Sequence, residues 1–323
     1  MIRKFKKCLI TGITGSGGSY LAEYIIKKSN KTRIFGFFRS YGYKNLLEKK
    51  HKNRISFLKV DMTNYSLVQK KINLIKPDVI FHLASNADVR GSFDFPIEHA
   101  KNNNLITVNL LESVRRSTCN PIIMICSTSE VYGNVSKKDM PINEKQKIAP
   151  INPYAVSKTY QDLISQVYHK SFDLKIIITR MFSYTNARRL NLFQTAFAKQ
   201  IALCESGKLK YVKHGNLKSV RTFVDIDDAM SAYWLAATKG KIGEIYNIGG
   251  DKIISVKEFL NKLIKLAKKK INTKLDKNLL RPQDLTLQIA SSKKFIAHTG
   301  WKKTVDFEDS VKKLLNECRR GIK

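Results

Sequence analysis

The sequence predicts an α/β protein with a Rossmann-like, doubly wound parallel sheet and a smaller C-terminal substrate-binding lobe. Three observations predict this fold. Short apolar runs alternate with helical patterns through the first half, the runs are apolar throughout, and a glycine-rich turn follows the first of them. A chain of 323 residues, 43% of them hydrophobic, is long enough to bury a substantial core.

The strands expected in the first half are short and apolar, as strands covered on both faces should be. They cover residues 8–11, 33–38, 55–60, 78–84, 122–127 and 175–182. Helical patterns separate them at 18–28, 64–76, 96–117 and 153–170. This alternation predicts right-handed crossovers between parallel strands.

After residue 183 the rhythm changes to longer helices and isolated strands. Helices are expected at 190–206, 227–238, 256–270 and 307–320, and Ser255 is placed to cap the third of these. We expect residues 1–182 to form the cofactor-binding domain, with 213–240 returning to it. Residues 183–212 and 241–323 should form the substrate-side lobe.

The net charge of +33 raises the question of an anionic partner. The excess is mainly lysine and is dispersed over nearly every expected element, without a concentrated basic arm or interleaved aromatic residues. This pattern favours a surface composition bias over a nucleic-acid partner, although a positive field would help capture an anionic substrate.

Other bulk features predict a cytoplasmic protein without metal or membrane. The five cysteines include no C-x-x-C pair, so no metal site is predicted, and a reducing compartment fits them best. The apolar run near the N-terminus is too short for a signal peptide, and no stretch approaches membrane-spanning length.

The glycine loop lies in "CLITGITGSGGSYLAEYI", between the first strand and the first helix. Gly12, Gly15 and Gly18 would let backbone N–H groups approach a pyrophosphate, whose charge the helix N-terminus favours. The strand before, the helix after and the N-terminal position together favour dinucleotide binding over a plain turn. The G-x-x-G-x-x-G spacing resembles the extended short-chain dehydrogenase/reductase superfamily.

The end of the second strand indicates which dinucleotide is bound. It reads "FFRS", without the acidic residue that accepts the ribose hydroxyls of NAD, and Arg39 could pair with a 2′-phosphate instead. We therefore expect NADP. The same resemblance implies that Asp61 and Met62 contact the adenine and that Leu83 and Ala84 line the cofactor site.

"NPYAVSK" supplies Tyr154 and Lys158 at i and i+4, on one face of a helix that begins near Pro153. A nearby ammonium group lowers the pKa of a phenol, which can then accept a sugar hydroxyl proton while a hydride leaves the same carbon for nicotinamide. The motif alone is common by chance. Its position after the strand at 122–127 and behind a glycine loop makes it specific.

That strand runs into Ser127, Thr128, Ser129 and Glu130. Because ligands in open α/β sheets bind beyond the carboxyl ends of the strands, these side chains should reach the substrate. Thr128 could hydrogen-bond the hydroxyl being oxidised. Glu130 could remove the C5 proton of a 4-keto sugar and help expel water from C6, or it could be a loop carboxylate or cap.

Four segments together resemble the GDP-mannose 4,6-dehydratase family: "GITGSGGSYLAEYI", "STSEVYG", "NPYAVSK" and "FSYTNARRLN". The likeness spans essentially the whole chain. It implies catalytic roles for Thr128, Glu130, Tyr154 and Lys158, and NADP that is bound tightly and recycled within each turnover. It also implies that the smaller lobe binds a nucleotide sugar.

The resemblance further implies a set of substrate contacts, with a homodimer or homotetramer as the assembly. The contacts are Ser92, Ser183, Arg188, Lys199, Arg221 and Arg281. Several residues depart from the family pattern, among them Ser183, where the family usually has Asn.

Other functions therefore stay open beside dehydration of GDP-mannose. They are reduction of GDP-4-keto-6-deoxymannose, another NAD(P)-dependent nucleotide-sugar epimerase or dehydratase reaction, and a non-catalytic dinucleotide-binding or nucleic-acid-binding role.

Overall fold

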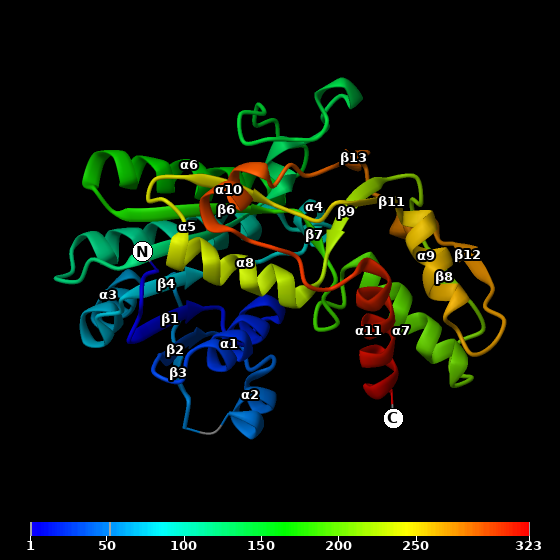
Figure 1. The fold of residues 1–323 in the computed structure, drawn as a ribbon, viewed down its shortest axis with the longest axis horizontal. Helices are drawn as coiled ribbons and strands as arrows, with labels where there is room; N and C mark the ends of the chain where they lie inside the picture. The colour runs from blue at the N-terminus through cyan, green and yellow to red at the C-terminus, as the bar shows by residue number, and fades with distance from the viewer. Residues whose placement is uncertain (1, 52, 323) are drawn as a thin grey trace.

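A computed structural model describes residues 2–51 and 53–322 and has two parts (Figure 1). The larger part is built on a seven-stranded sheet in the order β10-β6-β5-β4-β1-β2-β3, in which every neighbouring pair is parallel. Its strands are β1 (Lys7–Thr11), β2 (Arg33–Phe38), β3 (Ile55–Lys59), β4 (Val79–His82), β5 (Ile122–Thr128), β6 (Lys175–Met181) and β10 (Ile245–Ile248). This confirms the predicted α/β class with a Rossmann-like parallel sheet.

Helices cover both faces of this sheet, and the strands supply apolar side chains to each. Ile10 of β1 packs in a core with α1 (Ser16–Lys28) and α8 (Ile226–Lys239), whereas its neighbour Leu9 packs in the core on the opposite face. That face carries α3 (Tyr65–Ile75), α5 (Pro96–Arg115) and α6 (Pro153–Phe172). Burial on both faces explains why the strands read as continuous apolar runs. The short helices α2 (Lys44–Lys50), α4 (Gly91–Asp94) and α10 (Lys293–Thr299) complete this part.

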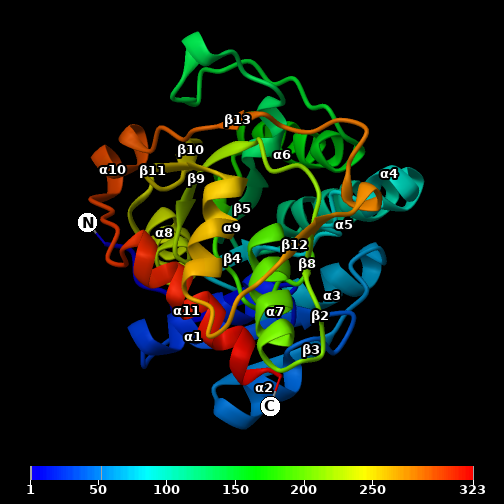
Figure 2. The same cartoon turned by 90° about the vertical axis from the view of Figure 1, so that its right-hand side faces the viewer.

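The smaller part lies to the right in Figure 1 and faces the viewer in Figure 2. Its small sheet has the order β11-β9-β13, with β7 also paired to β9, and β8 pairs with β12. These strands are β7 (Ser183–Tyr184), β8 (Val212–His214), β9 (Val220–Val224), β11 (Lys252–Ser255), β12 (Thr273–Leu275) and β13 (Leu287–Gln288). The helices are α7 (Phe193–Glu205), α9 (Val256–Lys265) and α11 (Phe307–Arg320).

An aromatic cluster holds this smaller part together. The Phe223 ring lies 5.1 Å from that of Phe259, and the rings of Phe193 and Phe307 pack against both, at 5.8–6.0 Å. Ser255 caps α9 as expected, in a reciprocal capping box with Glu258.

The path of the chain between the two parts differs from the expected division. Within 213–240, α8 packs on the main sheet, whereas β9 joins the small sheet by pairing with β11, β13 and β7. The strand β10, expected in the smaller lobe, forms the edge of the main sheet beside β6. Short strands carry too little pattern to say which sheet they join.

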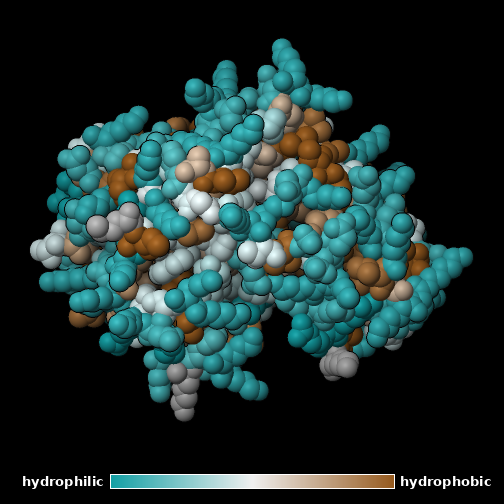
Figure 3. All heavy atoms as spheres, viewed as in Figure 1, coloured by the Kyte–Doolittle hydropathy of each residue, from teal (hydrophilic) through white to brown (hydrophobic). Residues whose placement is uncertain are grey.

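The surface is predominantly polar, and teal side chains cover most of the face drawn in Figure 3. Among the described residues, no helix combines the length and the apolar character that crossing a membrane requires. In the same residues, no cluster of three or more His, Cys, Asp or Glu side chains is arranged to hold a metal ion.

Candidate active site

The glycine loop joins β1 to α1 at the point where the strand order reverses. Gly12 has a φ of +70°, and a Cβ atom there would lie 2.9 Å from backbone atoms of Ala84. A Cβ on Gly18 would lie 2.3 Å from the carbonyl oxygen of Gly12. Only glycine fits at these two positions, which leaves an open backbone surface at the start of α1.

Beside this loop, the ends of β2, β3 and β4 form a groove, which we call the strand-end groove. Arg39 lies in it and donates from Nη1 to Asn102 Oδ1 at 2.9 Å. Asp61 accepts hydrogen bonds from the backbone and hydroxyl of Thr63, and these hold the pKa of its carboxyl below its usual range. The groove brings together seven of the predicted cofactor residues: Gly12, Gly15, Arg39, Asp61, Met62, Leu83 and Ala84.

A second hollow, of about 240 Å³, continues from the groove toward the smaller part, and we call it the central cavity. The two share Gly12, Gly15, Leu83 and Ser85 in their walls. Besides these shared residues, the central cavity brings together eight more of the predicted site residues: Gly18, Thr128, Glu130, Tyr154, Lys158, Ser183, Arg221 and Arg281. A ligand that spans groove and cavity would thus reach from Arg39 to Tyr154.

The end of β5 delivers Thr128 and Glu130 to this cavity. After Thr128 the chain turns into a short 3-10 helix, Ser129–Tyr132, and the Thr128 hydroxyl accepts the Glu130 N–H at 3.3 Å. Asn152 Nδ2 donates to Glu130 Oε2 at 2.9 Å. The carboxylate of Glu130 is therefore held from the side of α6, on the wall that also carries Tyr154.

Tyr154 and Lys158 lie on the first turns of α6, as predicted, and are 6% and 4% exposed. Burial raises the pKa of Tyr154, and the positive charge of Arg189 is the largest influence that lowers it. Burial also lowers the pKa of Lys158 to about 8. The lysine donates to the Cys126 carbonyl and to Gln161 Oε1.

Two arginines of the smaller part, Arg221 and Arg281, line the central cavity. Arg221, on β9, lies near Glu130, Asp284 and Arg281, and burial lowers its pKa. Arg281 pairs with Asp284 at 3.7 Å. Guanidinium groups in this position suit phosphate oxygens, which accept from two N–H groups at once.

Three predicted substrate contacts lie outside the central cavity, and we omit them from the site. Ser92 is buried and donates to the Val89 carbonyl. Arg188 is engaged with Ser19 and Glu23 on α1. Lys199 is an exposed residue of α7. Motif position alone placed these residues, and their side chains face other elements.

Comparison with known proteins identifies the family. The family model described as GDP-mannose 4,6 dehydratase matches residues 9–314.

The chain belongs to this family.

Individual relatives are named as 4,6-dehydratases of nucleotide sugars. A GDP-mannose 4,6 dehydratase of Drosophila melanogaster is 31% identical over 83% of this chain and 70% of its own length. A dTDP-D-glucose 4,6-dehydratase of Dictyostelium discoideum is 32% identical over 81% of this chain and 62% of its own.

Solved structures share the fold over nearly the whole chain. A UDP-glucuronic acid 4-epimerase of Bacillus cereus, in complex with UDP-glucuronic acid and NAD, has a TM-score of 0.86 at 27% identity and covers 97% of this chain and 99% of its own. RMD of Pseudomonas aeruginosa, complexed with NADPH, has a TM-score of 0.82 at 21% identity and covers 98% and 99%. The latter identity supports the fold alone.

Arg189, which the family resemblance pairs with Arg188 in the segment after the sixth strand, lines the central cavity and donates to the Ala87 carbonyl at 2.6 Å. Other residues of the site were given no role from the sequence. Tyr184 lies beside Arg189. Asn152 and Gln161 contact Glu130 and Lys158. The Asn before Pro153 was a readable N-cap signal, but a contact with a side chain 22 residues earlier has no local signature.

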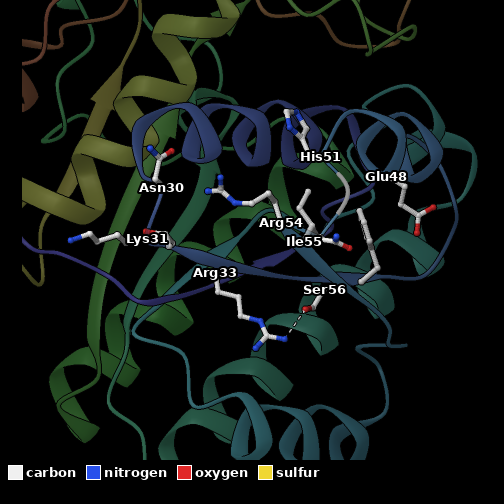
Figure 4. Close-up of a pocket in the computed structure, with 11 residues that line it drawn as sticks. Asn30, Lys31, Arg33, Glu48, His51, Arg54, Ile55 and Ser56 are labelled. Carbon is white, nitrogen blue, oxygen red and sulfur yellow. Dashed lines mark hydrogen bonds between the residues drawn. The ribbon is translucent and has the colours of Figure 1, made fainter.

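A larger hollow, of about 730 Å³, lies at the N-terminal ends of β2 and β3, away from the family motifs. Figure 4 shows that its basic side chains Lys31, Arg33 and Arg54 point in different directions. Arg54 donates to the Ser29 carbonyl, and Arg33 lies over the ring of Phe35. The cations do not converge on a common point, so we assign no ligand to this hollow.

Proposed function

We propose that this protein dehydrates GDP-mannose to GDP-4-keto-6-deoxymannose with NADP as a recycled cofactor. The observation that carries the proposal is the shared cavity of Glu130, Tyr154 and Lys158, in which Asn152 orients the carboxylate. Simple oxidation or epimerisation at C4 needs the phenol and the ammonium. A carboxylate held in the same cavity supplies a second acid–base group, which an elimination needs.

In this proposal each side chain has one task. Thr128 hydrogen-bonds the C4 hydroxyl, and Tyr154 accepts its proton. NADP, when bound, would supply the acceptor for the C4 hydride and the donor of that hydride to C6. Glu130 removes the C5 proton, which the new C4 ketone acidifies, and protonates the departing C6 hydroxyl, so that water leaves. Tyr154 would then return the proton it took from the C4 hydroxyl to C5. The positive charges of Lys158 and Arg189 favour the phenolate of Tyr154.

The choice of NADP rests on the strand-end groove. The groove suits a dinucleotide, because Gly12 and Gly15 line it without side chains. Arg39 lies in this groove at the tip of β2, and its Asn102 contact leaves other guanidinium N–H groups for a 2′-phosphate. The tip of β2 carries no carboxylate to accept ribose hydroxyls.

The choice of a GDP-sugar rests on the family and on the cavity wall. Arg221 and Arg281 would hold the diphosphate. The Drosophila relative is named for GDP-mannose. The expected homodimer or homotetramer stays a prediction, which light scattering on the purified protein would check.

A second candidate is the reductase of GDP-4-keto-6-deoxymannose, because the segment "RTFVDIDDA" (221–229), whose Arg221 lines the central cavity, resembles relatives that carry out this reduction. The two reactions differ in cofactor use. A dehydratase needs no added reductant, whereas a reductase consumes one NADPH for each sugar.

The test is incubation of purified protein with GDP-mannose alone, followed by mass spectrometry. Loss of one water without added reductant supports the proposal. Consumption of NADPH with the keto sugar, and no reaction with GDP-mannose, would establish the reductase instead. dTDP-glucose and UDP-glucose in parallel reactions would test the nucleotide.

A further inference from the structure

A chain of buried polar side chains runs behind the central cavity, from Lys158 to the cofactor loop. Gln161 Nε2 donates to Thr107 Oγ1 at 2.9 Å, and Thr107 Oγ1 lies 3.2 Å from His82 Nε2. His82 Nδ1 lies 2.8 Å from Thr11 Oγ1, which accepts the Ala84 N–H at 3.1 Å. The four side chains between Lys158 and Ala84 are at most 1% exposed. They join α6, α5, β4 and β1.

The hydrogen bonds between these buried polar side chains can be arranged in only one way. Thr107 gives its hydroxyl hydrogen to the Asn103 carbonyl at 2.8 Å, so its oxygen must accept from its other two neighbours. His82 therefore donates from Nε2, and its bare Nδ1 accepts from the Thr11 hydroxyl. Burial lowers the pKa of His82 to about 3, which agrees with a neutral ring that has one donor and one acceptor.

The same logic fixes the amide of Gln161. Its Nε2 must face Thr107, so its Oε1 must face the ammonium of Lys158. A flipped amide would point an NH2 group at a cation and leave both without a partner. Lys158 has three N–H donors, of which the Cys126 carbonyl and Gln161 take two. The third is left for the central cavity.

We propose that Gln161 is a positioning residue that fixes the place and charge of the Lys158 ammonium and couples it to the strand ends beneath the cofactor groove. The effect of Gln161 on turnover rests on the proposed function. The contact with Lys158 does not depend on which sugar is bound.

The electrostatic consequence follows from the groups around Lys158. Burial lowers its pKa, Cys126 of β5 and Asp162 of α6 act to raise it, and Arg189 acts to lower it. Asp162 is already paired with Arg180 at 2.8 Å, and His82 is neutral. A neutral acceptor such as Gln161 accepts a hydrogen bond from the ammonium without placing a negative charge beside it. A carboxylate in its place would neutralise the ammonium.

The test measures the titration of Lys158 directly, by competitive labelling with a small amine-reactive reagent and peptide-by-peptide mass spectrometry across pH. Gln161→Leu should lower the labelling midpoint of Lys158 by about one pH unit, because the ammonium loses an acceptor. Gln161→Glu should raise it by a similar amount. Thr107→Val, which frees the amide to flip, should also lower it.

Gln200→Leu is the matched control. Gln200 lies on α7, and its amide exchanges two hydrogen bonds with the backbone of Lys213, away from Lys158 and its neighbours. The Lys158 labelling midpoint of this variant should equal that of the wild type. Unchanged midpoints in Gln161→Glu and Thr107→Val would overturn the proposal, as would an equal shift in Gln200→Leu. Labelling needs no turnover, so a chain that labels as predicted but leaves GDP-mannose intact would contradict the proposed function alone.

Discussion

Asn152 joins the two halves of the candidate chemistry through one side chain. Its Nδ2 donates to Glu130 Oε2 at 2.9 Å, and its Oδ1 accepts the Ala155 N–H at 2.7 Å. The second contact caps the helix that carries Tyr154. The carboxylate and the phenol are therefore placed relative to each other by a single amide.

Two substitutions of Asn152 should separate these contacts. Asn152→Asp keeps an N-cap acceptor but places a carboxylate against Glu130, so thermal stability should stay within a few degrees while dehydration falls at least ten-fold. Asn152→Ala removes both contacts and should also lose about 1 kcal/mol of unfolding free energy. Thermal melting and product analysis check both. Full activity in Asn152→Asp would show that Glu130 needs no such support.

The pKa of Lys158 sets an upper limit on the working pH. Its pKa lies near 8, so the ammonium is present below that pH and is lost as the pH rises through it. The effect of the cation on Tyr154 disappears with it, and kcat/KM should fall on the alkaline side of about pH 8. A rate profile over the neutral and alkaline range measures this. A constant rate up to pH 10 would contradict it.

Cofactor preference should depend on Arg39. Arg39→Ala should weaken NADP binding about ten-fold, because a charge-assisted contact with a 2′-phosphate is lost, and should leave NAD binding nearly unchanged. Arg33→Ala, at the opposite end of the same strand, is the control and should bind both as the wild type does. Equal losses for both dinucleotides in Arg39→Ala would remove the basis for choosing NADP.

The buried ion pair of Arg180 and Asp162 should matter for stability. Arg180 Nε and Nη2 donate to both carboxylate oxygens of Asp162, at 2.8 and 3.1 Å, and both side chains are nearly inaccessible. Asp162→Ala leaves the guanidinium unpaired and should cost about 3–5 kcal/mol. Urea unfolding measures the loss. Lys262→Ala, which breaks an exposed pair with Glu308, should cost less than about 1 kcal/mol.

Local patterns were enough to predict the sheet and the centre of the site. The apolar runs, the glycines and the i, i+4 pair of Tyr154 and Lys158 are each written in a few neighbouring residues. Side chains that depend on contacts between distant segments were not predictable in this way. Gln161 reads as an ordinary helical residue until α5 is packed against it, and the contact of Asn152 with Glu130 joins residues 22 positions apart.

The same reason explains why three predicted substrate contacts, Ser92, Arg188 and Lys199, lie outside the central cavity. Arg188 and Arg189 are adjacent, yet one pairs with Glu23 on α1 and the other faces the central cavity. The sequence predicts the position of the loop but not the direction in which each of its side chains points. The division at residue 241 likewise assigned β10 to the smaller lobe, whereas its place beside β6 depends on the packing of the whole chain.

The most direct test of the account compares Glu130→Gln with the wild type on GDP-mannose, following both the absorbance of reduced nicotinamide and the loss of water. Gln keeps an acceptor for Asn152, so binding and oxidation at C4 should persist. Reduced cofactor should therefore accumulate without dehydration, and Tyr154→Phe should give neither signal. Dehydration by Glu130→Gln at the wild-type rate would contradict the role given to the carboxylate beside the phenol.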